Sequence, residues 1–484
     1  MHTSTISTSR LDPWTIQDLQ RATQGVWHQG IQPKESQSKE SQSKESHPME
    51  NIQRIVTDSR EATVGDAFLA LKGERFDAHD FVEKVAMQNA SCVIVERAIN
   101  GVNIPQLIVA DTRLALGYLG AYRRQQCQDL QVVALTGSSG KTTTKEMLGS
   151  IFSRLGETLV TRGNLNNDLG APIMLLELRA DHRYAVMELG ASHIGEIDYT
   201  SRLVQPDAAG ILNIGTAHLG EFGGRDAICK AKSEIYPHIK SAGTAIIPAQ
   251  DDYSAQILNI VNDVANGRAQ IRFGQGGDVY ATEIEILAQS SRFTLNTPKG
   301  SVQIDLPFAG AHNVQNAEAA TSFALAMGVS LEDIAIGLQQ ATGAKGRLNF
   351  IEKDQTLFID DTYNANPNSM RAAAQVLLQQ QGIKVMVMGD IGELGDDAEI
   401  EHQKLGQDLA QLKLDYVIAV GEYAPAVARG ADMSHCYAFA TQDEAQVRLE
   451  QIIQQHQPQP VSLLFKGSRY THMEHLLDAL MEKL

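Results

Sequence analysis

Cysteine is scarce in this chain. It occurs at only four of 484 positions, namely Cys92, Cys127, Cys229 and Cys436. No two of them have the spacing of a metal-binding motif, and their scatter forms no compact disulfide framework. The sequence therefore excludes a disulfide-stapled secreted scaffold and favours a reducing compartment, so we expect a cytoplasmic protein.

Basic residues are also few relative to acidic ones. The chain has 41 Lys and Arg against 58 Asp and Glu, a net charge of -17. This balance argues against a nucleic-acid protein that relies on non-specific phosphate contacts. The chain has no apolar run near the ~20 residues of a membrane helix, and its N-terminus lacks the apolar core of a signal peptide. We expect a soluble protein with no nucleic-acid partner and no membrane insertion.

The length and the ordinary hydrophobic content of 43% predict a folded chain of several domains. A chain of 484 residues is too long for one core, and two to four domains of ~100–200 residues are typical. Residues 34–46 (KESQSKESQSKES) form a repeat without any apolar side chain. Such a segment cannot bury a core, and it predicts a disordered surface insertion.

A phosphate-binding motif follows a short β-branched run at 132–136, which predicts a buried strand. The next residues are Gly137, Ser138, Ser139, Gly140, Lys141, Thr142 and Thr143, and a helical pattern continues from them. Glycines let backbone N–H groups surround an anion, and a helix N-terminus adds positive partial charge. We expect Lys141 to contact phosphates and Thr142 to hold Mg²⁺ through its hydroxyl.

The motif is the short form of the phosphate loop. The full Walker pattern has a glycine five positions before the second glycine, where this chain has Leu135. A plain glycine turn between a strand and a helix is the alternative interpretation. The strand before it and the helix after it favour the phosphate loop.

Segments before the loop predict a small α/β domain over residues 1–125. Short apolar strands alternate with polar turns, and Ser59 and Arg60 follow one such strand. Taken alone, these two are ordinary turn residues. Beyond the loop, Glu188 and His218 come at or just after the ends of two predicted strands. Open α/β sheets bind ligands at that edge, so the pair favours a Mg²⁺ site.

Two further patterns complete the chain. Between residues 270 and 306, IRFG, VYATEIEIL, SRFTLNT and VQIDLPF alternate apolar and polar residues, which predicts antiparallel hairpins. Asn313 opens the next helix and is most simply a helix cap. From residue 343 to 484, strands alternate with helices, which predicts a Rossmann-like, doubly wound parallel sheet. The central domain would then span 126–342.

A series of motifs resembles the Mur ligases, the ATP-dependent amide-forming enzymes of peptidoglycan precursor synthesis. These motifs are TGSSGKTTTKE, RGNLNNDLGAP, MELGASHIGEI, NIGTAHLGEFG, AKSEI, AHNVQNAEAA, GRL, DDTYNANPNSM and LFKGSR. They run in order over nearly the whole chain, apart from the repeat and the residues before about 50. GNLNND, GDIGELG and DDTYNANPNSM most resemble the member that adds D-alanyl-D-alanine to UDP-N-acetylmuramoyl-tripeptide.

The resemblance implies an acyl-phosphate mechanism that uses ATP and Mg²⁺, with two metal sites. It implies that Lys141, Lys232 and His218 are catalytic and that Lys232 carries a carbamate derived from CO₂. The metal ligands would be Thr142, Glu188, His218 and carbamylated Lys232. The remaining nucleotide contacts would be Asn313, Arg347 and Asp361, beside the loop residues 137–143. The substrate contacts would be Ser59, Arg60, Asn364, Asn366, Ser468 and Arg469.

Three alternatives remain open from the sequence. A sister ligase that adds a single amino acid would keep the same ATP site. A folylpolyglutamate-type ligase should lack the domain that precedes the loop. A nucleotide-switch protein would use the loop without ligation, but it would not need the charged loops of the last domain.

Lys230 lies two positions from Lys232 and is an alternative for the modified lysine. We expect a monomer.

Overall fold

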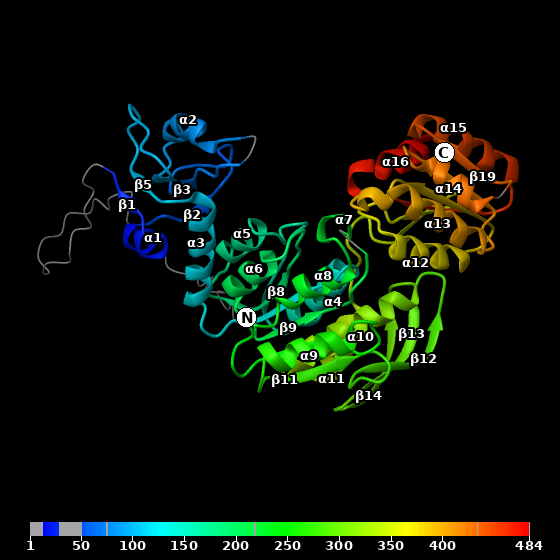
Figure 1. The fold of residues 1–484 in the computed structure, drawn as a ribbon, viewed down its shortest axis with the longest axis horizontal. Helices are drawn as coiled ribbons and strands as arrows, with labels where there is room; N and C mark the ends of the chain where they lie inside the picture. Colours follow the sequence, from blue (N-terminus) through cyan, green and yellow to red (C-terminus); the bar gives the residue numbers. More distant parts are fainter. Residues whose placement is uncertain (1–12, 29–50, 74–75, 217–218, 433, 484) are drawn as a thin grey trace, which may run out of the picture. The chain divides into compact units, whose positions relative to one another are not determined.

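The computed structural model describes residues 13–28, 51–73, 76–216, 219–432 and 434–483 (Figure 1). The repeat at 34–46 lies outside these ranges. The chain forms two compact units, and the first comprises residues up to Gln131 together with Thr161–Ala185 and Arg202–Gln205. The second comprises Val132–Val160, Val186–Ser201 and the chain from Pro206 onward. No helix in the described ranges is both long and apolar enough to cross a membrane.

The first unit contains a five-stranded sheet of order β1-β5-β4-β3-β2. Its strands are β1 Val26–Trp27, β2 Arg54–Val56, β3 Asp66–Leu69, β4 Cys92–Val95 and β5 Gln106–Ile108. Its helices are α1 Ile16–Thr23, η1 Ala78–Phe81, α2 Val82–Met87 and α3 Thr112–Gln126. All pairings are parallel except that of β1 with β5. Strand residues alternate between two cores: Ile94 packs with Leu116 of α3, whereas Val93 packs with Val85 of α2.

A six-stranded sheet of order β11-β10-β9-β6-β8-β7 carries the phosphate-loop motif. Its strands are β6 Gln131–Thr136, β7 Glu157–Val160, β8 His182–Glu188, β9 Ala208–Ile211, β10 Thr244–Pro248 and β11 Ala269–Phe273. The helices of this region are α4 Lys141–Ser153, α5 Gly170–Leu176, α6 Glu196–Val204, α7 Leu219–Phe222, α8 Arg225–Ser233, α9 Ser254–Val264, α10 Ala311–Ala326 and α11 Leu331–Gln339. The predicted strand at 132–136 and the helix after the loop are both present, as β6 and α4.

The prediction of hairpins between 270 and 306 is wrong for its first segment. IRFG belongs to β11, which pairs in parallel with β10 at the edge of the central sheet. Helix α9 connects these two strands, and such a crossover is how adjacent parallel strands are joined. The later segments form an antiparallel three-stranded sheet of β12 Tyr280–Ile286, β13 Ser291–Thr297 and β14 Gly300–Leu306, as predicted.

The last part of the chain forms a six-stranded sheet of order β15-β16-β20-β17-β18-β19. The strands are β15 Asn349–Lys353, β16 Thr356–Asp360, β17 Ile383–Gly389, β18 Tyr416–Val420, β19 Cys436–Phe439 and β20 Val461–Lys466. The helices are α12 Pro367–Leu378, η2 Gly395–Asp397, α13 Ala398–Ala410, α14 Ala424–Ala431, α15 Gln442–His456, η3 Arg469–Thr471 and α16 Met473–Lys483. Only β15 is antiparallel to its neighbour.

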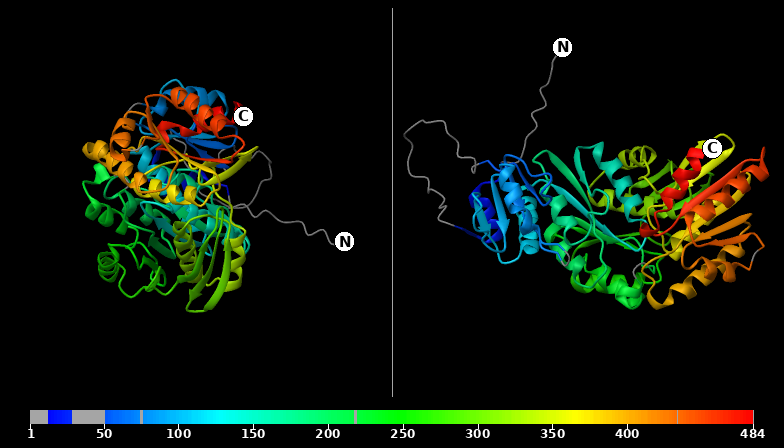
Figure 2. Two further views of the ribbon diagram at one scale, coloured as in Figure 1. Left: turned by 90° about the vertical axis from the view of Figure 1, so that its right-hand side faces the viewer. Right: turned by 90° about the horizontal axis from the view of Figure 1, so that it is seen from above.

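Helices cover both faces of this last sheet (Figure 2). Met370 of α12 and Leu405 of α13 pack in one core, and Leu449 of α15 and Leu477 of α16 pack in the other. The doubly wound sheet predicted from the strand–helix alternation is therefore confirmed, and so is the α/β class of the chain. The loops that follow the parallel strands β16, β20 and β17 all leave from the same edge of the sheet.

Candidate active site

The phosphate loop connects β6 to α4 and is held by the neighbouring strand connection. The Oδ1 of Asn213 accepts a hydrogen bond from the Ser139 N–H at 3.0 Å, and its Nδ2 donates to the Ser139 carbonyl at 3.0 Å. The Oγ of Ser138 accepts from the Gly215 N–H at 2.9 Å. Gly140 has φ +80, where residues with a Cβ are strained. These bonds fix the shape of the loop without any ligand.

Lys141 lies at the first position of α4, and its ammonium turns back onto the loop. The Nζ donates to the Gly137 carbonyl at 2.8 Å. Burial lowers the pKa of Lys141, and the carboxylate of Glu188 acts in the opposite direction. A cation at this place is suited to contact phosphate oxygens that the loop binds.

Oxygen ligands for a divalent cation converge behind the loop. Glu188 ends β8 and is 3% exposed. Its Oε2 lies 3.3 Å from the Thr142 hydroxyl, which donates to it, and 4.0 Å from the Nζ of Lys145. A carboxylate and a hydroxyl are hard oxygen donors, so this set fits Mg²⁺. His218, the third predicted ligand, lies outside the described residues.

Burial distinguishes Lys232 from Lys230. Lys232 of α8 is 2% exposed, whereas Lys230 is exposed. Within the described ranges, the Lys232 ammonium forms neither a hydrogen bond nor an ion pair. Burial lowers the pKa of Lys232 well below its ordinary value, and the nearby charge of Lys141 lowers it further. A neutral amine is the form that reacts with CO₂, so Lys232 fits a carbamate site.

Helix α10 supplies two buried asparagines. The Nδ2 of Asn313 donates to the Ala309 carbonyl at 2.8 Å, and its Oδ1 accepts from Asn316 at 3.0 Å. The prediction that Asn313 caps the helix is therefore wrong, because its side chain satisfies a carbonyl of the preceding turn. Asn316 packs against the phosphate loop, since a Cβ added to Gly140 would lie 2.3 Å from its Oδ1.

Charged residues from the last sheet face the same loop. Arg347 lies before β15, and its guanidinium donates to the Thr142 hydroxyl at 3.5 Å and stacks on Tyr363 at 4.4 Å. Asp361 follows β16 and pairs with Lys466 at the end of β20, with Oδ2 and Nζ 2.7 Å apart. Lys466 also donates to the backbone carbonyl of Asn364 at 2.9 Å.

A cavity of about 290 Å³ within the second unit joins these groups. The phosphate loop contributes Ser139, Gly140 and Thr143 to its lining. Other polar residues of the lining come from α10 and from the chain after Gly346, among them His312, Asn313, Gln315, Asn316, Glu318, Arg347, Asp361, Asn368 and Lys466. Apolar surface comes from Leu212, Pro248, Phe273 and Phe308. The cavity thus combines an anion-binding end with apolar walls, as a nucleotide site requires.

The predicted substrate contacts of the last sheet have structural partners of their own. Asn366 caps α12 and forms a reciprocal capping box with Ser369. The Oγ of Ser468 accepts from the Gly392 N–H at 2.8 Å. Arg469 is exposed and pairs with Glu474 at 2.6 Å.

Ser59 and Arg60 belong to the first unit. They follow β2, and Arg60 pairs with Asp58 at 2.5 Å. The bonds of Arg60 hold the pKa of the Asp58 carboxyl at about 2.

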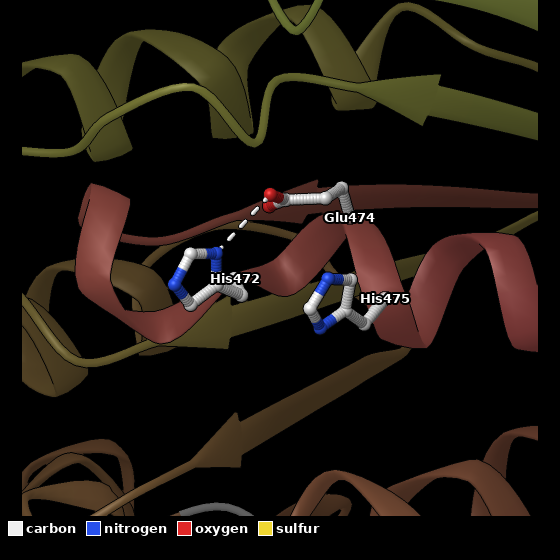
Figure 3. Close-up of side chains that lie close together, drawn as sticks. All are labelled: His472, Glu474 and His475. Atoms are coloured by element: carbon white, nitrogen blue, oxygen red, sulfur yellow. Dashed lines mark hydrogen bonds and ion pairs between the residues drawn. The ribbon is translucent and has the colours of Figure 1, made fainter. Parts of the chain in front are cut away.

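Three side chains of the kinds that bind metal ions also lie close together at the start of α16. In the described part of the chain, ligand atoms of His472, Glu474 and His475 lie within 4.8 Å of one another (Figure 3). However, Glu474 already accepts from the guanidinium of Arg469, and the two imidazole rings stack with only 9° between their planes. Stacked rings direct their nitrogen lone pairs side by side rather than toward one point, so a network of surface side chains explains this group.

Sequence reasoning missed Asn213, Asn316 and Glu318 as parts of the site. Asn316 and Glu318 stand within the motif AHNVQNAEAA, so the motif marked their segment but not their roles. Asn213 lies in the connection after β9 and is the first residue of the motif NIGTAHLGEFG, so here too the motif marked the segment but not the role of the residue. The described structure identifies all three through contacts with residues that are distant in sequence.

Comparisons with known proteins agree with this arrangement. A model of the Mur ligase middle domain matches residues 135–324, and a model of the Mur ligase, glutamate ligase domain matches residues 346–469. The UDP-N-acetylmuramoyl-tripeptide--D-alanyl-D-alanine ligase of Escherichia coli (strain K12) is 42% identical over 435 residues, which cover 89% of this chain and 94% of that protein.

Solved structures are similar over the whole fold. The crystal structure of MurF from Acinetobacter baumannii has a TM-score of 0.91 and 64% identity, and the match covers 98% of this chain and 100% of that one. The MurF ligase of Thermotoga maritima, solved in complex with ADP, has a TM-score of 0.79 and 27% identity, with 90% and 99% covered. From these similarities, from the two domain models and from the cavity beside the phosphate loop, we conclude that this chain belongs to the Mur ligase family.

Proposed function

We propose that this protein is an ATP-dependent ligase that joins D-alanyl-D-alanine to the terminal carboxylate of UDP-N-acetylmuramoyl-tripeptide. One observation carries the proposal: the phosphate loop and the charged residues Arg347, Asp361 and Lys466 line a single cavity. A nucleotide switch would need the loop alone, whereas a ligase needs cations around a transferred phosphoryl group. The printed names of a relative in Escherichia coli and of a second solved structure from Acinetobacter baumannii, a D-alanyl-D-alanyl ligase, support the choice of the dipeptide as acceptor.

The first step transfers the γ-phosphoryl group of ATP to the tripeptide carboxylate. A carboxylate oxygen forms a bond to the γ-phosphorus, the bond to the β–γ bridging oxygen breaks, and ADP leaves. Negative charge gathers on the phosphoryl oxygens during this transfer. The loop N–H groups, Lys141 and Arg347 would stabilise that charge; the contacts of Lys141 with Gly137 and of Arg347 with Thr142, both at the loop, support these roles.

The second step forms the amide bond. The amine of D-alanyl-D-alanine attacks the acyl carbon and gives a tetrahedral intermediate. The carbon–oxygen bond to phosphate then breaks, phosphate leaves, and the amine nitrogen loses a proton. The charge on the departing phosphate needs the same cations as the first step, so one set of residues serves both steps.

We further propose that Thr142, Glu188 and His218 hold Mg²⁺ and that Lys232 carries a carbamate. A magnesium ion in such a site supplies neutralisation of charge on phosphate oxygens. The described members fit, because Glu188 and Thr142 are oxygen donors and Lys232 is a buried amine with no counter-ion among the residues that the structure describes. A carbamate would replace the ammonium by an oxygen ligand of negative charge.

The remaining contacts are proposals from family resemblance. Asn313 would contact the nucleotide base, and Asp361 would reach the nucleotide from the last sheet. Ser59 and Arg60 would bind the UDP part of the substrate. The contacts to the acceptor would be Asn364, Asn366, Ser468 and Arg469. The corresponding domains would be 1–125 for the UDP-substrate, 126–342 for ATP and 343–484 for the acceptor.

We also propose that the protein acts as a monomer. Size-exclusion chromatography with light scattering would test this, with a mass near 52.7 kDa expected for the monomer.

Phosphate release tests the function directly. The assay contains ATP, Mg²⁺ and UDP-N-acetylmuramoyl-tripeptide, with D-alanyl-D-alanine, with a single amino acid, or with no acceptor. We expect release that depends on the dipeptide, together with a UDP-pentapeptide seen by mass spectrometry. Release with a single amino acid instead would assign the chain to a sister ligase, and no release with any acceptor would overturn the ligase proposal.

A further inference from the structure

Glu318 is a buried acidic residue that lines the cavity beside the phosphate loop. It lies on α10, and the residue is 4% exposed. Within the described ranges, no lysine or arginine pairs with it. The phosphoryl-transfer steps proposed above do not use it, so its presence in the wall of a nucleotide-sized cavity needs another explanation.

The two carboxyl oxygens of Glu318 differ in their surroundings. Oε1 accepts a hydrogen bond from the Ala281 N–H of β12 at 2.7 Å. Oε2 is buried and has no hydrogen-bond partner among the described residues. Burial raises the pKa of this carboxyl to about 7. A buried acceptor without a partner is unfavourable unless a ligand supplies the missing donor.

The position of Glu318 separates it from the phosphate-binding end of the cavity. Residues two positions apart on a helix lie about 200° apart around its axis. Asn316 contacts the loop at Gly140, whereas Glu318 bonds to β12. Phe273, at the end of the adjacent β11, lines the cavity as well. Glu318 thus belongs to a partly apolar region away from the phosphates, and such a region is suited to a flat nucleobase.

We propose that Glu318 selects the nucleobase by accepting a hydrogen bond at Oε2 from the exocyclic amine of adenine. This inference rests on the ATP use of the proposed function. Adenine presents a donor at C6, whereas guanine and hypoxanthine present a carbonyl acceptor there. At a pH above about 7, where the Glu318 carboxyl is ionised, a carbonyl facing Oε2 would leave both acceptors without a donor, so the test is made at such a pH. Sites that are built to bond one polar group reject analogues that lack it, because the buried partner stays unpaired.

The substitution Glu318→Gln tests this geometry sharply. The amide oxygen of glutamine is needed at the Oε1 position, because the Ala281 N–H requires an acceptor. The NH₂ group must then stand where Oε2 was, which turns the acceptor into a donor. The variant should therefore favour a base with a carbonyl at C6. Inosine triphosphate is the matched probe, since its base lacks the adenine amine and carries that carbonyl.

The measurement is kcat/KM of the full-length enzyme with ATP and with inosine triphosphate. We expect wild type to prefer ATP by about 100-fold or more. Glu318→Gln should lower that preference at least about 30-fold, through both a loss with ATP and a gain with inosine triphosphate. Glu285→Gln, an exposed acid on β12, is the control and should keep the wild-type ratio.

Two results would overturn the inference while leaving the ligase proposal in place. One is equal use of the two nucleotides by wild type, a result that depends on no variant. The other is an unchanged ratio in Glu318→Gln, with a melting curve that shows a folded protein. Absence of any ATP-dependent ligation by wild type would instead overturn the proposed function on which this inference rests.

Discussion

The Nζ of Lys466 lies 2.7 Å from the Oδ2 of Asp361, and both side chains are less than a tenth exposed. The two residues are 105 positions apart in the chain, but β16 and β20 are adjacent parallel strands that place them side by side. Burial lowers the pKa of Lys466, and the charge of Asp361 opposes this effect. Asp361 thus favours the charged form of Lys466 in the cavity wall, whereas burial alone would disfavour that form.

Removing one partner of this pair should be costly. Asp361→Ala leaves a buried ammonium without its counter-ion, and we expect a loss of about 3–5 kcal/mol in the free energy of unfolding. The double variant Asp361→Asn with Lys466→Met removes the uncompensated charge and should recover part of that loss. Urea denaturation of the single and double variants measures both effects. Equal stability of Asp361→Ala and wild type would contradict the prediction.

Gly140→Ala should weaken nucleotide binding by more than the strain of a positive φ alone would cause. A Cβ at Gly140 would lie 2.3 Å from the Oδ1 of Asn316, and φ is +80. Gly328, just after α10, has φ +79 and nothing within 4 Å of an added Cβ. Both substitutions carry a strain of about 1–2 kcal/mol, but only the first displaces the loop.

Isothermal titration of ATP into both glycine variants provides the comparison. We expect at least about a tenfold weaker Kd for Gly140→Ala and a change of less than about twofold for Gly328→Ala. Equal affinities in the two variants would show that Asn316 moves aside at little cost and that the loop tolerates the methyl group.

Lys232→Ala should reduce ligase activity at least about 100-fold, and Lys230→Ala should retain it. Lys232 is buried and its pKa is lowered, which favours the neutral amine that reacts with CO₂, whereas Lys230 is exposed. Carbon-13 NMR after equilibration with labelled bicarbonate should show a carbamate signal in wild type and in Lys230→Ala. A signal that persists in Lys232→Ala would assign the modification to another lysine.

Glu318 should make stability depend on pH. Its folded pKa is about 7 and its ordinary value is 4.5, so the folded state binds more protons between these values. Wild type should therefore lose stability as pH rises through that window, and the loss should be complete above about pH 7. Glu318→Gln does not titrate, so the difference between variant and wild type should shift by up to about 3 kcal/mol in the variant's favour.

Chemical denaturation at pH 5 and pH 8 measures this shift, with Glu285→Gln as the control for a general charge effect. A stability difference that is the same at both pH values would show that Glu318 titrates normally in the folded protein. The titration of other groups cancels in this comparison, because the two proteins differ at one position only.

Local patterns predicted much of the framework of the site. The buried strand β6, the glycine turn and helix α4 follow from residues adjacent in the chain, because hydrophobic periodicity and glycine placement act within about ten residues. The position of Glu188 at the end of β8 was predicted in the same way. The doubly wound last sheet followed from its regular alternation of strands and helices, which permits few arrangements.

Tertiary structure decided what depends on distant contacts. The sequence alone left Lys230 and Lys232 as alternatives, and burial of one face of α8 distinguished them. The partner of β11 could not be read from four alternating residues, because the pattern does not say which strand lies beside it. The unpaired Oε2 of Glu318 arises only when α10 packs on β12, 37 positions away. The sequence by itself therefore determined the elements and the phosphate loop, whereas long-range packing decided which of their side chains are buried, paired or left for a ligand.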